Sequence, residues 1–324
     1  MESKNPIIRR KTKKVKVGNI YIGGDAPISV QSMTVNKTYD VEKTLKEMDT
    51  LVEAGCQVIR VTVPDKKSAM AIEEYKKRIE VPIVADIHFN SAMALLAVDY
   101  GADKIRINPG NIGSRERVET VLNKVKKYNL PIRIGVNAGS LERDLLEKYG
   151  YPTPEAVVES AEKHLKICEE FDFNDVIVSL KASDVRLMIE SYQLFSKKYD
   201  YPVHLGVTEA GPIKSGSIKS AIGLGSLLNE GIGDTIRVSL TEDSVEEVKV
   251  GFEILKSLGL SSRGVTIIAC PTCGRLEVDL FKIAGDMEKK LAHIKKPMSL
   301  ALMGCAVNGP GEATHADMGV AFGK

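Results

Sequence analysis

The sequence lacks the marks of membrane and secreted proteins. No apolar stretch reaches the roughly 18 residues of a membrane-spanning helix, and the polar start MESKNPIIRRKTKK has no apolar core of a signal peptide. Only five of the 324 residues are cysteine, and disulfides are rare in the cytosol. We therefore expect a soluble, cytoplasmic protein whose cysteines are buried residues, reactive thiols or metal ligands.

A large excess of charge is also absent. The formal net charge is +2, which is too small to favour nucleic acid as a partner, and we expect the basic run RRKTKK near the start to be a solvated tail. Hydrophobic residues make up 43% and charged residues 27% of the chain, the balance of a globular protein with a large core. The length fits a barrel of roughly 250 residues with a small appendage.

One unit recurs along most of the chain: a short β-branched run, a polar loop and a segment with helical periodicity. The alternating residues 14–24 come first and predict a β-hairpin around Gly18 and Asn19. Helical periodicity is clear in residues 40–55, 114–128, 153–171 and 244–259. Strands that alternate with helices indicate parallel pairing. The eight predicted strands are residues 28–34, 57–63, 82–88, 104–109, 131–137, 175–181, 203–209 and 235–240.

Eight such units indicate an α/β protein whose first domain, residues 1–260, is a (β/α)₈ TIM barrel preceded by the hairpin. The composition changes near residues 258–264, where we expect a linker. A strand at 265–269, a helix at about 276–294, a strand at 298–303 and a Gly-rich loop then predict a small α+β domain, residues 261–324.

Polar residues occupy one face of the barrel strands, toward their carboxyl ends. Because alternate residues of a barrel strand point inward, the strand patterns place five cations inside, where unpaired charge is costly. The carboxylates Asp86 and Glu209 compensate only part of it, so we expect an anionic ligand, with phosphate as the natural candidate for arginine. The interior cations are Arg60, Arg106, Arg133, Lys181 and Arg237.

Other residues at the carboxyl ends of the strands are candidates for the same site. His88 shares its strand face with Asp86, whereas His204 comes earlier in its strand and is expected to be packed inside the barrel. The loop after the seventh strand, with Gly211, Lys214, Gly216 and Lys219, lies where many barrels bind phosphate.

Three cysteines in the C-terminal domain resemble an incomplete set of metal ligands. Cys270 and Cys273 form a C-x-x-C pair, and Cys305 adds a third thiol from a separate loop. This pattern fits either zinc or an iron-sulfur cluster, and Glu312, His315 and Asp317 are the candidates for a fourth ligand. We expect Cys56 and Cys168 to be small buried residues instead.

The motifs together resemble a known family. ACPTCGR and GCAVNGPGEA, with VQSMT, VIRVTVP, VADIHF, IRINPGNIG, IRIGVNAGS, SLKAS, GVTEAG and TIRVSL, are similar to the signatures of 4-hydroxy-3-methylbut-2-enyl diphosphate synthases of the bacterial two-domain type. The resemblance covers nearly the whole chain. It implies a [4Fe-4S] cluster held by Cys270, Cys273, Cys305 and Glu312, whose carboxylate is more easily displaced from iron than a thiolate.

The resemblance also implies an activity and partners. The family reduces 2-C-methyl-D-erythritol 2,4-cyclodiphosphate by two electrons from flavodoxin or ferredoxin, opening the ring and removing a hydroxyl group. The active site is expected in a homodimer, between the barrel of one subunit and the cluster domain of the other. By resemblance Glu209 protonates or orients the departing oxygen with Asp86 and His88 nearby, and the substrate is bound by Arg60, Arg106, Asn108, Arg133, Asn137, Lys181, Thr208, Arg237 and Ser239.

Two departures from the family pattern and two other hypotheses remain. Thr314 and His315 stand where family members usually have a basic and an acidic residue. Family members also usually continue beyond the position of Lys324, so we expect a shortened sequence or a further tail. This leaves the final strand of the C-terminal domain in doubt. One alternative is a non-redox barrel enzyme with a phosphorylated substrate and structural zinc. The other is an electron carrier whose cluster only relays electrons.

Overall fold

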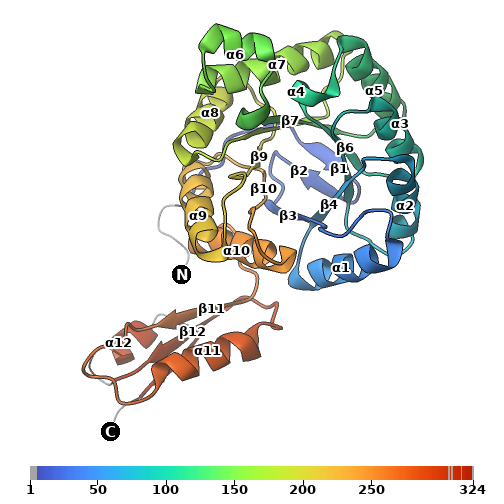
Figure 1. Cartoon of the computed structure of the whole chain (residues 1–324). Coiled ribbons are helices and arrows are strands. Elements are labelled where there is room, and N and C mark those ends of the chain that lie inside the picture. The colour runs from blue at the N-terminus through green and yellow to red at the C-terminus, as the bar shows by residue number, and fades with distance from the viewer. Residues whose placement is uncertain (1–5, 306, 308, 315, 323–324) are drawn as a thin grey trace. The chain divides into compact units, whose positions relative to one another are not determined.

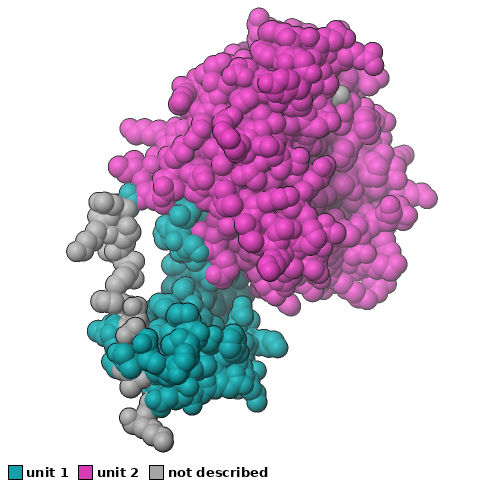
Figure 2. Space-filling model, turned by 60° about the vertical axis from the view of Figure 1, so that its left-hand side comes forward, with its two compact units in different colours: residues 1–6, 255–324 teal, residues 7–254 magenta. Residues whose placement is uncertain are grey.

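The chain folds into two compact units, which Figure 2 shows in different colours. The first unit comprises Ile7–Ile254 and the second begins at Leu255. The computed structural model describes residues 6–322 except 306, 308 and 315. Residues 258–264 form an irregular connection between α10 (Ser244–Ser257) and β11 (Val265–Ala269).

The first unit contains eight parallel strands in the order β8-β7-β6-β5-β4-β3-β10-β9. The two ends of this order also meet, because Val178 of β8 bridges Val203 and its N–H donates to the carbonyl of Pro202 at 2.9 Å. The predicted (β/α)₈ barrel is therefore confirmed. Its strands are β3 (Ser29–Met33), β4 (Val58–Thr62), β5 (Ile83–Ile87), β6 (Lys104–Ile107), β7 (Ile132–Asn137), β8 (Val176–Lys181), β9 (His204–Leu205) and β10 (Thr235–Ile236).

Helices follow the strands and surround the barrel (Figure 1). Their apolar faces turn inward, as with Met48 and Leu51 of the first helix, and side-chain caps such as Thr153 fix their starts. Among the described residues, no helix has the length and apolar character to cross a membrane. The helices are α1 (Val41–Ala54), α2 (Lys66–Lys76), α3 (Ser91–Asp99), α4 (Pro109–Ile112), α5 (Arg115–Lys127), the 3₁₀ turn η1 (Ala138–Ser140), α6 (Arg143–Tyr149), α7 (Pro154–Glu170), α8 (Val185–Lys198), α9 (Ile213–Asn229) and α10.

The predicted hairpin closes the amino-terminal end of the barrel. Strands β1 (Val15–Val17) and β2 (Ile20–Ile22) pair antiparallel and lie across the centre of the ring in Figure 1. Val15, Val17 and Ile22 are buried in one apolar cluster with Ile177 of β8. The base of the barrel is therefore sealed by apolar side chains.

The prediction of a solvated basic tail was wrong for its first two arginines. Arg9 Nη2 lies 3.1 Å from Asp234 Oδ1, and Arg10 Nη2 donates to the carbonyl of Tyr201 at 2.8 Å. The backbone N–H of Arg10 also bonds the carbonyl of Gly231 at 2.9 Å. Carbonyls and a carboxylate at the base of the barrel thus give these cations partners that the local sequence does not reveal.

The second unit is a three-stranded parallel sheet in the order β11-β12-β13, with β12 (Met298–Met303) between β11 and β13 (Met318–Ala321). Helix α11 (Leu280–Leu291) packs on it around Leu280, Leu300 and Leu302, and the short α12 (Gly309–Ala313) precedes β13. The predicted strands 265–269 and 298–303 are confirmed. A final strand, which the sequence left in doubt, is present as β13.

The helix predicted at 276–294 is shorter than expected. Asp279 caps its start by accepting a hydrogen bond from Lys282 N at 3.1 Å. The preceding residues bond elsewhere, with Leu276 N donating to Cys273 O and Glu277 N to Gly304 O. The apolar periodicity of 276–279 therefore comes from a loop that packs against the sheet.

Candidate functional site

The strand registers arrange the inward side chains of the barrel in layers of four from alternate strands. Branched apolar residues usually fill such layers, but here most members are polar. From the base upward we name four of them. They are the lower layer (Val58, Lys104, Ile177, Thr235), the middle layer (Gln31, Val84, Arg133, His204), the arginine layer (Arg60, Arg106, Ser179, Arg237) and the glycine layer (Met33, Asp86, Gly135, Gly206).

A cavity of about 50 Å³ lies in the upper part of this interior. Eight of the nine predicted substrate-binding residues line it, together with Ser179, which was not among those nine. Two larger depressions, of about 390 and 360 Å³, are lined by the N-terminal segment and its neighbours instead. The residues around the small cavity are Arg60, Arg106, Arg133, Asn137, Ser179, Lys181, Thr208, Arg237 and Ser239.

Asp86 organises two of the arginines. Its Oδ2 lies 2.8 Å from Arg60 Nη2, and its Oδ1 lies 2.9 Å from Arg106 Nη1. Burial alone would raise the pKa of Asp86, but the charges of Arg60 and Arg106 outweigh it and lower that pKa well below its usual range. The carboxylate therefore stays ionised and holds both guanidinium groups in fixed orientations.

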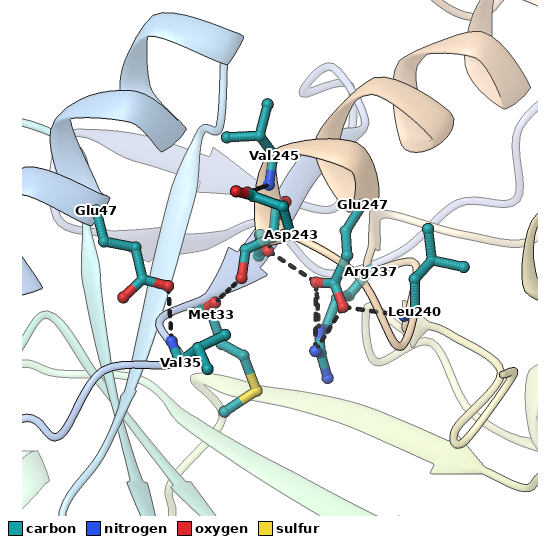
Figure 3. Close-up of polar contacts among 10 residues, drawn as sticks. Met33, Val35, Glu47, Arg237, Leu240, Asp243, Val245 and Glu247 are labelled. Atoms are coloured by element: carbon teal, nitrogen blue, oxygen red, sulfur yellow. Dashed lines mark hydrogen bonds and ion pairs between the residues drawn. The ribbon is translucent and has the colours of Figure 1, made fainter. Parts of the chain in front are cut away.

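Glu247 of α10 performs the same role for Arg237 (Figure 3). Its carboxylate lies 3.0 Å from Arg237 Nη2 and accepts hydrogen bonds from Leu240 N at 3.1 Å and Ser32 Oγ at 2.8 Å. The side chain is only 4% exposed. Glu247 was not predicted from the sequence, although an acidic residue on the buried face of the last barrel helix was a usable signal.

Arg133 and Lys181 have no such partner. Within the described part of the chain, no carboxylate lies in salt-bridge contact with either side chain. Burial and then the neighbouring cations lower the pKa of Lys181 and of Arg133. The cavity therefore has a surplus of positive charge, as the strand patterns predicted.

Two glycines make room for these long side chains. A Cβ at Gly135 would lie 2.4 Å from Arg106 Nε, and a Cβ at Gly206 would lie 2.7 Å from Lys181 Nζ. Arg106 Nη2 also donates to the carbonyl of Gly135 at 2.9 Å. Any larger residue would push the cations away from the cavity.

The remaining predicted residues do not line the cavity. His88 Nε2 is 3.4 Å from Asp86 Oδ2, whereas Asn108 is buried beside the cavity and donates to Ser140 Oγ at 3.0 Å. Glu209 is exposed and has φ of +53°, a left-handed conformation that is uncommon for a residue with a side chain. Lys214 and Lys219 are exposed and do not line the cavity.

The cysteines of the second unit lie at the carboxyl ends of neighbouring strands. Cys270 follows β11, Cys305 follows β12, and Gly304 N donates to Cys270 Sγ at 3.3 Å. The loop that contains Cys273 is tied to the same place, since Glu277 N bonds the carbonyl of Gly304 at 3.0 Å. Across the described side chains, no three cysteine, histidine or acidic groups already converge in metal-binding geometry. The loops nevertheless bring all three thiol-bearing segments to one edge of the sheet, and thiols suit an iron-sulfur cluster.

The candidates for a fourth ligand are separated by the fold. Asp317 Oδ2 accepts hydrogen bonds from Ser299 N at 2.7 Å and Ser299 Oγ at 2.8 Å. Ser299 is near the start of β12, about 13 Å along the strand from its last residue, Met303, so Asp317 lies toward the opposite end of this strand from the cysteines. Glu312 lies in α12, which begins with Gly309 close to the ends of β12 and β13. The side chain of Glu312 and all of His315 lie outside the described residues.

Cys56 and Cys168 are buried, as predicted. Burial raises the pKa of each thiol to about 12. Neither thiol is therefore a ready nucleophile or metal ligand at neutral pH. His204 is likewise buried inside the barrel, as predicted.

Several solved structures have folds similar to that of this chain. Dihydropteroate synthase of Yersinia pestis aligns with a TM-score of 0.54 and 14% identity over 76% of this chain and 98% of that one. A 3-dehydroquinate dehydratase of Geobacillus kaustophilus gives a TM-score of 0.54 and 14% identity over 77% and 99%. At this identity the likeness shows the fold alone.

Sequence comparison is far more specific. Residues 12–252 match the GcpE TIM-barrel domain and residues 266–324 the GcpE protein C-terminal domain. A 4-hydroxy-3-methylbut-2-en-1-yl diphosphate synthase (flavodoxin) of Bacillus licheniformis is 59% identical over 97% of this chain and 85% of its own length. The enzyme of that name from Geobacillus thermodenitrificans is 59% identical over 97% of this chain and 84% of its own length. The chain therefore belongs to the GcpE family.

Proposed function

We infer that this chain is an oxidoreductase of isoprenoid biosynthesis that converts 2-C-methyl-D-erythritol 2,4-cyclodiphosphate to (E)-4-hydroxy-3-methylbut-2-enyl diphosphate. The names of relatives that are 59% identical over nearly the whole chain support this activity. The observation that carries the inference is the cavity, in which cations from five strands face an interior with too few carboxylates. A diphosphate supplies the missing negative charge.

The cations bind the diphosphate and hold the ring in place. Arginine binds phosphate oxygens through paired N–H groups, and Asp86 and Glu247 fix three of the four guanidinium groups before substrate arrives. Arg133 and Lys181, which have no carboxylate partner in the described structure, gain the most from the ligand. Asn108, Asn137, Thr208 and Ser239 complete the binding residues at the upper end of the site.

The reaction consumes two electrons and one proton, breaks the C–O bond that closes the ring, and releases a hydroxyl group as water. Glu209 is our candidate for delivering the proton to the departing oxygen, because it is exposed and directly follows Thr208, which lines the cavity. His88 is 3.4 Å from the ionised Asp86. We propose that Asp86 orients the His88 ring toward the substrate.

The [4Fe-4S] cluster is proposed for the second unit. Cys270, Cys273, Cys305 and Glu312 would hold it, and when bound it would supply the electrons one at a time. The adjacent positions of the loops that contain the three cysteines support this assignment. A carboxylate as the fourth ligand would leave one iron with a replaceable partner.

Several further assignments follow from the family. We propose flavodoxin as the electron donor, since the names of the relatives specify it, with ferredoxin as the alternative. We also propose a cytoplasmic homodimer in which the barrel of one subunit, residues 1–260, works with the cluster domain of the other, residues 261–324. Mixing Arg133→Ala with Cys273→Ala subunits tests this, because only a shared site regains activity in mixed dimers.

The decisive experiment combines analysis of the metal with turnover. Protein purified without oxygen should contain iron and acid-labile sulfide and should convert the cyclic diphosphate when a chemical reductant is supplied. Arg133→Ala should retain the iron and sulfide but lose most of the turnover. Zinc without iron or sulfide would support a structural metal site instead, and a loaded but inactive protein would indicate an electron carrier.

A further inference from the structure

A fully buried lysine lies deeper in the barrel than the proposed substrate site. Lys104 is the first residue of β6 and is 0% exposed. Its ammonium group has three donors and no acceptor, yet Nζ has no hydrogen-bond partner among the described residues. Lys104 does not line the cavity, so a ligand bound there does not compensate its charge.

Polar side chains of the middle layer, directly above Lys104, also contain buried atoms without a hydrogen-bond partner. Gln31 Nε2 and Oε1, Arg133 Nε and Nη1, and His204 Nε2 are all buried without a hydrogen-bond partner in the described structure. Each residue is no more than 1% exposed. Buried polar groups are normally satisfied. Atoms without a partner also occur elsewhere in the described structure, as in His164 and Ser220, but here four strands present them in two adjacent layers, and this concentration points to a bound species.

No described carboxylate forms an ion pair with Lys104 or Arg133, although Asp103 and Asp86 lie near enough to act on them electrostatically. Asp86 is bound to Arg60 and Arg106, and Glu247 is bound to Arg237. Asp103 bonds the Lys76 ammonium at 2.7 Å and Ile83 N at 2.8 Å instead of Lys104. Beneath the lower layer, the apolar hairpin seals the barrel.

We propose that a single halide ion, chloride in the cell, binds between Lys104 Nζ, Arg133 and His204, below the cavity for the diphosphate. A halide only accepts hydrogen bonds, which suits a place where donors outnumber acceptors. Water would add two more donors. The interior of an eight-stranded barrel is filled by its side chains, so a monoatomic ion fits where phosphate or sulfate does not.

Crystals of the full chain grown in sodium bromide provide the direct test. Anomalous scattering should place a bromide ion within hydrogen-bond distance of Lys104 Nζ and Arg133. Anomalous density confined to the cavity above, or ordered water alone beside Lys104, would refute the proposal. The result does not depend on the catalytic activity, because the crystals report ion binding at Lys104, which does not line the substrate cavity, although Arg133 borders both sites.

A solution measurement gives an independent test. With excess pyrophosphate to occupy the cavity, replacing gluconate by chloride at constant ionic strength should raise Tm by about 5 °C at 100 times Kd. Lys104→Met should abolish this shift, whereas Lys76→Met, which removes a lysine outside the barrel interior, should keep it. An equal chloride effect in both variants would contradict the assignment. Should Lys104→Met fail to fold, the bromide crystals of the unaltered chain decide the matter.

Discussion

Replacing Asp86 by asparagine tests the electrostatic design of the cavity with almost no change of shape. Asp86 is 0% exposed and contacts Arg60 at 2.8 Å and Arg106 at 2.9 Å. The variant leaves the buried guanidinium group of Arg106 and the largely buried one of Arg60 without their carboxylate. Removal of one partner of a buried ion pair costs about 3 to 5 kcal/mol. We expect the free energy of unfolding to fall by that amount.

Urea denaturation followed by circular dichroism measures the change. Asp25→Asn is the matched control, because Asp25 forms a 2.7 Å ion pair with Lys14 on the exposed surface, where such pairs contribute little. Excess pyrophosphate should restore part of the stability of Asp86→Asn, since the ligand replaces the lost negative charge. A loss below about 1 kcal/mol would mean that water or rearrangement compensates the arginines, and our account of the cavity would be wrong.

The same carboxylate gives a pH dependence with a defined sign. The pKa of Asp86 is lower in the folded state than in the unfolded chain, so the unfolded state takes up its proton first as the pH falls. Its stabilising contribution is complete above the unfolded pKa and declines below it. The difference in stability between the unaltered chain and Asp86→Asn should therefore be constant above about pH 5 and decrease under more acidic conditions.

Two further substitutions test the packing of the cavity and the metal ligands. Gly135→Ala places a methyl group 2.4 Å from Arg106 Nε, so it should lower the free energy of unfolding by about 1 to 3 kcal/mol and raise KM. Gly139→Ala is the control, because a Cβ there meets no atom within 4 Å, and it should leave KM unchanged. Equal effects of the two substitutions on KM would contradict the steric argument. Glu312→Gln should reduce cluster retention and turnover by about tenfold or more. Asp317→Asn, which changes the contact with Ser299, should retain the iron. If both variants keep their iron and activity, Glu312 is not the fourth ligand.

The sequence predicted the barrel because strand and helix periodicities are local. Eight β-branched runs, each followed by a helical segment, leave few alternatives to a closed parallel sheet. Alternation within each run also predicted which charges face inward, and the cavity collects eight of the nine residues chosen on that basis and by resemblance. For example, Lys181 lies two residues after Ser179, and Arg237 lies two residues before Ser239, so alternation places each pair on the inward face of its strand.

What the sequence did not reveal depends on contacts between distant segments. Glu247 follows Ser244 by three residues, a spacing that equally suits a helix cap, and only the folded barrel shows that its carboxylate reaches Arg237. Lys104 shares a strand face with Arg106, but alternation along one strand does not show that a lysine at the start of that strand is fully buried. Arg9 and Arg10 look like part of a solvated tail until the base of the barrel supplies their acceptors.

The docking of the N-terminal segment has a consequence for synthesis on the ribosome. Arg9 and its partner Asp234 are 225 residues apart, and translation proceeds at about 5 to 20 residues per second. Arg9 therefore waits about 10 to 45 s for Asp234 to be made. Until then its ion pair at the base of the barrel cannot form, so this segment docks only after most of the barrel has been synthesised.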